Sequence, residues 1–220
     1  MECQGEDEEI VCLDESFFIN DNYQLTRFTF GSHVLELYCL QSASMQFFIP
    51  TLLETYANAD FDLTGQLVWP GAELLNDFLS KNADMLRGCS VIELGSGVGI
   101  TGILCSRFCE KVVMTDHNEE ILKRNIELHD TSQNLVCSAE LKAEKLEWGN
   151  SEQLDYILQR HPKGFDLVLG ADIYILILLF IMDNMVINEA TRLGLRVSEV
   201  AGTRATVRNL EGCIYEITCG

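Results

Sequence analysis

The chain has 220 residues, which is long enough for one α/β domain with a substantial core. It carries 34 Asp and Glu residues against 15 Lys and Arg, so its formal net charge is −19. A field of that sign repels nucleic acid phosphates and anionic membranes. It therefore disfavours nucleic acid and membrane partners and favours a basic protein partner.

The use of cysteine indicates a reducing compartment. Nine cysteines are present, but the chain shows no signal-peptide pattern, and several cysteines fall in apolar segments, such as Cys89, Cys105 and Cys137. Reduced thiols in the cytoplasm, or also in the nucleus, are expected rather than a disulfide framework. No Cys-x-x-Cys pair occurs and the histidines are scattered, so no metal site is expected, and we expect a monomer.

Three regions follow from the residue patterns. Residues 1–20 are predicted to form an acidic, flexible tail, because seven of the first 15 residues are acids and none is Lys or Arg. Within 21–62, alternating residues over Tyr23–Leu40 predict a β-hairpin, and the apolar stretch Met45–Ala59 is interpreted as an inserted segment. Residues 63–220 are predicted to form the main α/β domain.

The main domain begins with a Trp-Pro-Gly segment. Leu67–Ala72 leads into a helix, and Pro70 suits the first turn of that helix because its fixed φ is already helical. Trp69 has two interpretations. It either belongs to the core or closes over a bound cofactor.

The most informative stretch is a glycine-rich turn. Val91–Leu94 is predicted to be a buried parallel strand, and Ile100–Phe108 a helix that packs back over it. Between them, Gly95, Gly97 and Gly99 stand at alternate positions. Glycine is needed where the backbone takes positive φ or where a ligand comes too close for a Cβ, so this turn is the expected binding site.

The next strand indicates which kind of ligand binds. Lys111–Asp116 ends in an acid 19 residues beyond Gly97, where a βαβ unit places the carboxylate that binds ribose hydroxyls. The two strands together predict an adenosine-containing cofactor. A dinucleotide fingerprint requires glycine where this chain has Ile100, so a pyrophosphate site is disfavoured.

Further elements alternate between helix and strand. We predict a helix over Ile121–Leu128, a strand over Leu135–Leu141, a helix over Gln153–His161 and a strand over Phe165–Asp172. Trp148, which follows the third strand, is either a platform for an adenine ring or a core residue.

The region after the fourth strand is short. A helix over Asp183–Leu195 and hairpin strands over Arg196–Ala201 and Gly212–Thr218 are predicted. Only Ile173–Met182 remains for a helix plus a strand, which together need roughly 25 residues, and this apolar run is also shorter than the roughly 20 residues that span a bilayer. We therefore expect that a segment is missing here and that Ile175–Met182 substitutes as the central strand.

Taken as a set, five segments resemble the seven-β-strand methyltransferases that use S-adenosylmethionine (SAM), and among them the non-histone protein lysine methyltransferases. The segments are Val68–Ala72, Glu93–Gly99, Thr115-Asp116, Leu146–Gly149 and Phe165–Asp172. The resemblance implies a Rossmann-like methyltransferase sheet, incomplete around the fifth strand, in 63–220. It also implies SAM as cofactor and a lysine side chain of a protein as methyl acceptor.

The resemblance also implies a set of site residues. Those expected to bind the cofactor are Trp69, Glu93, Gly95, Ser96, Gly97, Asp116, Trp148 and Ala171.

Asp172 is the predicted catalytic residue. Its carboxylate can hold the substrate ammonium by charge-assisted hydrogen bonds, and the alternative is a helix cap or a bond to the cofactor. The family pattern places an aromatic residue three positions after this acid, whereas here Tyr174 follows after two. The displaced aromatic and the short central region leave a second function open, a catalytically silent SAM-binding or scaffolding isoform. Methylation of a small molecule or of a nucleic acid is a third, less favoured function.

Overall fold

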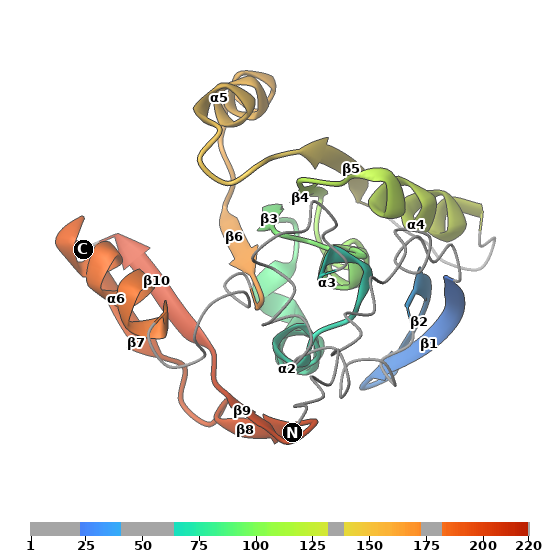
Figure 1. Ribbon diagram of the computed structural model, residues 1–220, viewed down its shortest axis with the longest axis horizontal. Helices are drawn as coiled ribbons and strands as arrows, with labels where there is room; N and C mark the ends of the chain where they lie inside the picture. Colours follow the sequence, from blue (N-terminus) through green and yellow to red (C-terminus); the bar gives the residue numbers. More distant parts are fainter. Residues whose placement is uncertain (1–22, 41–63, 132–138, 173–181, 220) are drawn as a thin grey trace, which may run out of the picture.

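A four-stranded parallel sheet forms the centre of the computed structural model, which describes residues 23–40, 64–131, 139–172 and 182–219. Its strands are β3 (Ser90–Leu94), β4 (Lys111–Asp116), β5 (Glu140–Lys145) and β6 (Leu167–Gly170), and they lie in the order β5-β4-β3-β6 (Figure 1). The chain first adds strands on one side of β3 and then crosses to the other. This Rossmann-like arrangement confirms the predicted α/β fold, and its topological switch point lies between β3 and β6.

The sheet is buried most deeply at β3 and β4, as continuous apolar runs predict for a parallel sheet. On one face, Val91, Val112 and Met114 pack with residues of α2 (Pro70–Lys81), α3 (Ile100–Cys105) and α4 (Glu120–Thr131). On the other face, Ile92 and Val113 contact Ile157 of α5 (Ser151–Arg160).

The N-terminal hairpin is confirmed, and it belongs to the same core. Strands β1 (Gln24–Phe30) and β2 (His33–Cys39) are antiparallel, and Gly31 takes φ +57° in the tight turn between them. Leu35 and Leu37 of β2 are buried against the helices. The Asn125 side chain of α4 fixes this packing, because it bonds to both the N–H and the C=O of Tyr38.

Two predicted strands have different limits in the structure. The third strand spans Glu140–Lys145 and so continues beyond the predicted end at Leu141, because β5 is a half-exposed edge strand whose alternating charged residues give no apolar pattern; positions 135–138 of that prediction lie outside the described residues. The fourth strand stops at Gly170, so Ala171 and Asp172 lie beyond its end. The helix predicted to reach Phe108 ends at Cys105.

The C-terminal part is a helix followed by two hairpins. Helix α6 (Met182–Arg192) precedes strand β7 (Leu195–Glu199), which pairs antiparallel with β10 (Tyr215–Cys219), close to the predicted limits. An additional hairpin, β8 (Ala205–Val207) and β9 (Leu210–Gly212), lies between these strands and had not been predicted. It lies beside α2 (Figure 1). Two short 3-10 turns, η3 (Thr64–Gln66) and η4 (Ala83–Leu86), flank α2.

Several predictions lie outside the described residues. They concern the tail over 1–20, the insertion over Met45–Ala59 and the strand over Ile175–Met182. Among the parts of the chain that the structure describes, no strand pairs with the outer edge of β6. None of the described helices combines the length and the apolar character needed to cross a membrane.

Candidate cofactor site

A cavity of about 100 Å³ lies at the carboxyl ends of β3 and β6, at the switch point of the sheet. This is where open α/β sheets bind their ligands. The cavity brings together every site residue predicted from the sequence, including Asp172. Its predicted lining residues are Trp69, Glu93, Gly95, Ser96, Gly97, Asp116, Trp148, Ala171 and Asp172.

The glycine turn has the backbone geometry that only glycine adopts readily. Gly95, Gly97 and Gly99 take φ of +64°, +53° and +84°. Ser96 fixes this turn to the neighbouring strand, because its N–H donates to the Thr115 carbonyl at 2.9 Å and its Oγ accepts from the Thr115 N–H at 3.1 Å. The turn is therefore tied to β4 by two hydrogen bonds, and Gly95, Ser96 and Gly97 line the cavity.

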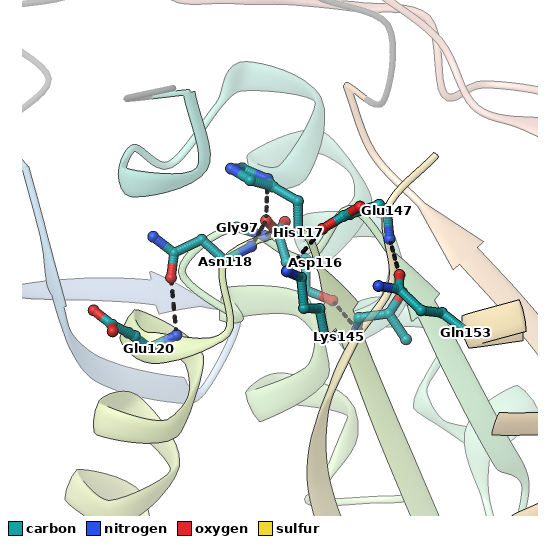
Figure 2. A network of polar contacts seen from close by, with 10 residues as sticks. Gly97, Asp116, His117, Asn118, Glu120, Lys145, Glu147 and Gln153 are labelled. Atoms are coloured by element: carbon teal, nitrogen blue, oxygen red, sulfur yellow. Dashed lines mark hydrogen bonds and ion pairs between the residues drawn. The ribbon is translucent and has the colours of Figure 1, made fainter. Parts of the chain in front are cut away.

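Asp116, at the end of β4, is held by contacts with three neighbouring residues (Figure 2). Its Oδ2 accepts from the Gly97 N–H at 2.9 Å, and its Oδ1 accepts from the Asn118 N–H at 3.2 Å. His117 Nδ1 lies 2.8 Å from the same Oδ1. The carboxylate is 8% exposed and joins the glycine turn to the start of α4, so it is held in one orientation at the cavity.

Glu93 lies at the bottom of the cavity and is almost fully buried, with 3% exposure. Its Oε2 accepts from the Gly102 N–H at 3.0 Å, and Ser96 and Thr101 also bond to it. Burial, which disfavours the charged form, raises the pKa of this carboxyl from 4.5 to about 7, although the hydrogen bonds oppose the shift. Glu93 therefore changes charge near neutral pH.

This pKa shift predicts a pH dependence of stability. Because the folded state binds a proton more tightly than the unfolded state, the contribution of Glu93 is fully present below pH 4.5 and is lost as pH rises through 7. The expected loss is about 3 kcal/mol. In Glu93→Gln the side chain stays neutral at every pH and still accepts from the Gly102 N–H. The free energy of unfolding of this variant should therefore be higher than that of the wild type at pH 8, but not at pH 4.5.

Urea unfolding of both proteins between pH 4.5 and 8 measures this difference, and groups other than Glu93 cancel in the comparison. Exposed Glu152→Gln serves as the matched control and should leave the pH profile unchanged. A difference between Glu93→Gln and wild type that stays constant over this range contradicts the prediction.

Asp172 caps helix α2, which was the alternative to its predicted catalytic role. Its Oδ2 accepts from the Ala72 N–H at 3.0 Å, and the Gly71 N–H also bonds to the carboxylate. Helix α2 needs this acceptor, because its own N-cap residue, Trp69, offers no side-chain cap. Burial raises the pKa of Asp172, and the two backbone hydrogen bonds oppose that rise.

The Trp-Pro-Gly segment and Asp172 are sterically interlocked. A Cβ on Gly71 would lie 2.4 Å from Asp172 Oδ2, so the carboxylate occupies the space that any other residue would fill. Asp172 itself takes φ +50°, a conformation that is uncommon for a residue with a Cβ. The glycine at position 71 is therefore explained by a contact with a residue 101 positions later in the chain.

The two tryptophans border the cavity from different elements. Trp69 precedes α2, whereas Trp148 lies in the turn after β5 and is 61% exposed. Both are at the cavity, as the cofactor interpretation requires. Their contact with a cofactor stays a prediction, and so do the roles of the other predicted site residues.

Several lining residues had not been predicted. Gly65 in η3 packs against the glycine turn so closely that a Cβ on Gly97 would lie 3.0 Å from its carbonyl oxygen. Val68, Ala72 and Thr101 also line the cavity. The segment before α2 meets the turn only in the folded chain, so no local spacing predicts these positions.

The chain is similar to several known lysine methyltransferases. It matches the model of the lysine methyltransferase family over residues 55–189. It is 38% identical to protein N-lysine methyltransferase METTL21A of Mus musculus over 112 residues, which are 49% of this chain and 46% of that protein. It is 34% identical over 119 residues to calmodulin-lysine N-methyltransferase of Arabidopsis thaliana, covering 51% of this chain and 36% of that protein.

A third relative, protein-lysine methyltransferase METTL21E of Mus musculus, is 32% identical over 143 residues, 57% of each chain. The matched part of this chain thus covers between 36% and 57% of the length of these three relatives.

The fold and the family match define a Rossmann-like α/β domain of the methyltransferase class. Within that class, the chain belongs to the lysine methyltransferase family, because the family model covers more than half of its residues.

Proposed function

We propose that the chain binds SAM in the cavity between β3 and β6 and transfers its methyl group to a lysine side chain of a protein. The observation that carries the proposal is the chemistry of the lining. Glu93, Asp116 and Asp172 line the cavity, and no Lys or Arg is found among its described lining residues. Such a site suits a cationic sulfonium compound and does not suit a pyrophosphate.

The geometry of the turn supports the same cofactor. Asp116 is held at the end of β4, where its carboxylate would bind ribose hydroxyls, and the backbone of the Gly95–Gly97 turn would lie beside the methionine part. The enclosed volume, about 100 Å³, holds only part of such a molecule, so the remainder would extend along the side of the cavity that Trp148 borders.

Catalysis would depend mainly on position. SAM supplies an electrophilic methyl group, and the acceptor nitrogen must approach that group in line and without its proton. With a lysine pKa near 10.4, forming the neutral amine at pH 7.4 costs about 4 kcal/mol. Asp172 lines the cavity, and its carboxylate would orient the ammonium by charge-assisted hydrogen bonds until the proton leaves.

Two relatives support a protein acceptor through their names, since one is a calmodulin-lysine methyltransferase and another a protein N-lysine methyltransferase. The net charge of −19 favours a basic substrate segment. We place the protein in the cytoplasm, or also in the nucleus, as part of the same proposal.

A silent SAM-binding isoform is the second candidate, and the capping contact of Asp172 favours it. The carboxylate expected to receive the ammonium is already bonded to the N-terminus of α2. Binding and turnover must therefore be measured separately.

The experiment combines calorimetric titration with SAM and transfer of labelled methyl groups to proteins of a cell lysate, followed by mass spectrometry of the modified residue. Labelled lysine supports the proposed activity. Saturable binding without any labelling supports the silent isoform, and absence of binding by a folded sample contradicts both.

Variants of Asp172 test its catalytic role. Asp172→Asn keeps an acceptor for the Ala72 N–H but loses the charge, so we expect methyl transfer to fall about 100-fold while the melting temperature changes little. Asp172→Ala should also destabilise the protein by about 1 kcal/mol, because α2 loses its cap. Full activity of Asp172→Asn would assign this residue to capping alone.

A further inference from the structure

The β8–β9 hairpin contacts the site through an unusual turn. Arg208 and Asn209 take φ of +49° and +68°, which is the geometry of a two-residue type I′ turn. Glycine, asparagine and aspartate suit both positions of such a turn, whereas arginine pays a conformational cost there. The side chain of Arg208 is therefore the feature to examine.

The Arg208 guanidinium reaches across to the segment that begins α2. It forms an ion pair with the Glu73 carboxylate, and its Nη1 donates to the Val68 carbonyl at 3.4 Å. The two charged side chains are 31% and 21% exposed, so water screens this pair less than a pair on the open surface. A guanidinium suits this position because it donates to two acceptors at once.

These contacts flank the part of α2 that borders the cavity. Trp69 lies between Val68 and Glu73 in the chain, and Asp172 also bonds to the same segment through the Ala72 N–H. We propose that Arg208 is a positioning residue of the cofactor site, which fixes the segment from Val68 to Glu73 so that Trp69 borders the cavity. The proposal rests on the proposed function for its effect on SAM affinity, and its effect on Trp69 is independent of that function.

Arg208→Gly separates positioning from folding. Glycine relaxes the turn but removes the guanidinium, so the melting temperature should stay equal or rise while the Kd for SAM rises about fivefold, as expected for one lost hydrogen-bonded contact. Arg208→Lys keeps a cation and should recover part of the affinity. Arg204→Ala is the matched control, because Arg204 pairs with Glu199 of β7 and its loss should leave the Kd unchanged.

Trp69 itself provides a second measurement. The chain has two tryptophans, so a Trp148→Phe background leaves Trp69 as the single reporter. In that background, Arg208→Gly and Glu73→Gln should both increase acrylamide quenching of Trp69 fluorescence, and Arg204→Ala should not.

The outcomes are distinct. Increased quenching with an unchanged or higher melting temperature supports the proposal. Unchanged quenching of Trp69 in Arg208→Gly overturns the proposal. The proposal also fails if Arg208→Gly lowers the melting temperature enough to explain the weaker SAM binding and Arg208→Lys does not restore it. If wild-type protein does not bind SAM, the proposed function fails, and the quenching of Trp69 still decides whether Arg208 positions the segment.

Discussion

Asp116→Ala is expected to weaken SAM binding at least about 100-fold, which corresponds to about 2.7 kcal/mol. The carboxylate accepts from the N–H groups of Gly97 and Asn118, so its loss frees the glycine turn and removes the group placed to bind ribose hydroxyls. Each such charge-assisted bond contributes about 1.5 to 3 kcal/mol. Calorimetric titration with SAM measures the effect directly.

Two further variants separate charge from geometry. Asp116→Asn keeps an acceptor for the Gly97 N–H, so it should bind SAM with intermediate affinity. Asp155→Ala removes an exposed acid of α5 and should bind as wild type does. Wild-type affinity of Asp116→Ala would show that the cofactor site lies elsewhere.

Gly102→Val is expected to destabilise the fold by about 3 kcal/mol or more, because α3 packs directly on the sheet at this position. A Cβ on Gly102 would lie 2.3 Å from both Cγ and Sδ of Met114 and 3.1 Å from Glu93 Oε2. Met114 is fully buried and cannot withdraw without disturbing the core. For a chain of this size, the melting temperature should fall by about 10 °C.

The partner residue offers a test of this explanation. Met114→Ala opens space beside Gly102, so Gly102→Ala should be less destabilising in that background than in wild type. Thermal unfolding of the single and double variants gives the coupling. Additive effects of the two substitutions would mean that contact with Met114 is not the reason for glycine at this position.

The sequence patterns predicted most of the element order. Val91–Leu94 and Lys111–Asp116 are buried on both faces, and such strands appear as continuous apolar runs whatever surrounds them. The end of strand β5 at Lys145 was not predicted, because a half-exposed edge strand with charged residues has no comparable pattern. The β8–β9 hairpin was missed because arginine stands at the first position of its turn, where glycine, asparagine or aspartate would mark a tight turn.

The sequence by itself determined the turn of three glycines and the acid 19 residues beyond Gly97, because both depend on spacing within one βαβ unit. Only the tertiary structure showed that Asp172 caps α2, that Gly71 leaves room for this carboxylate and that Arg208 reaches Glu73. These contacts join residues about 100 or more positions apart. Folding alone brings such residues together, so no local pattern in the chain records them.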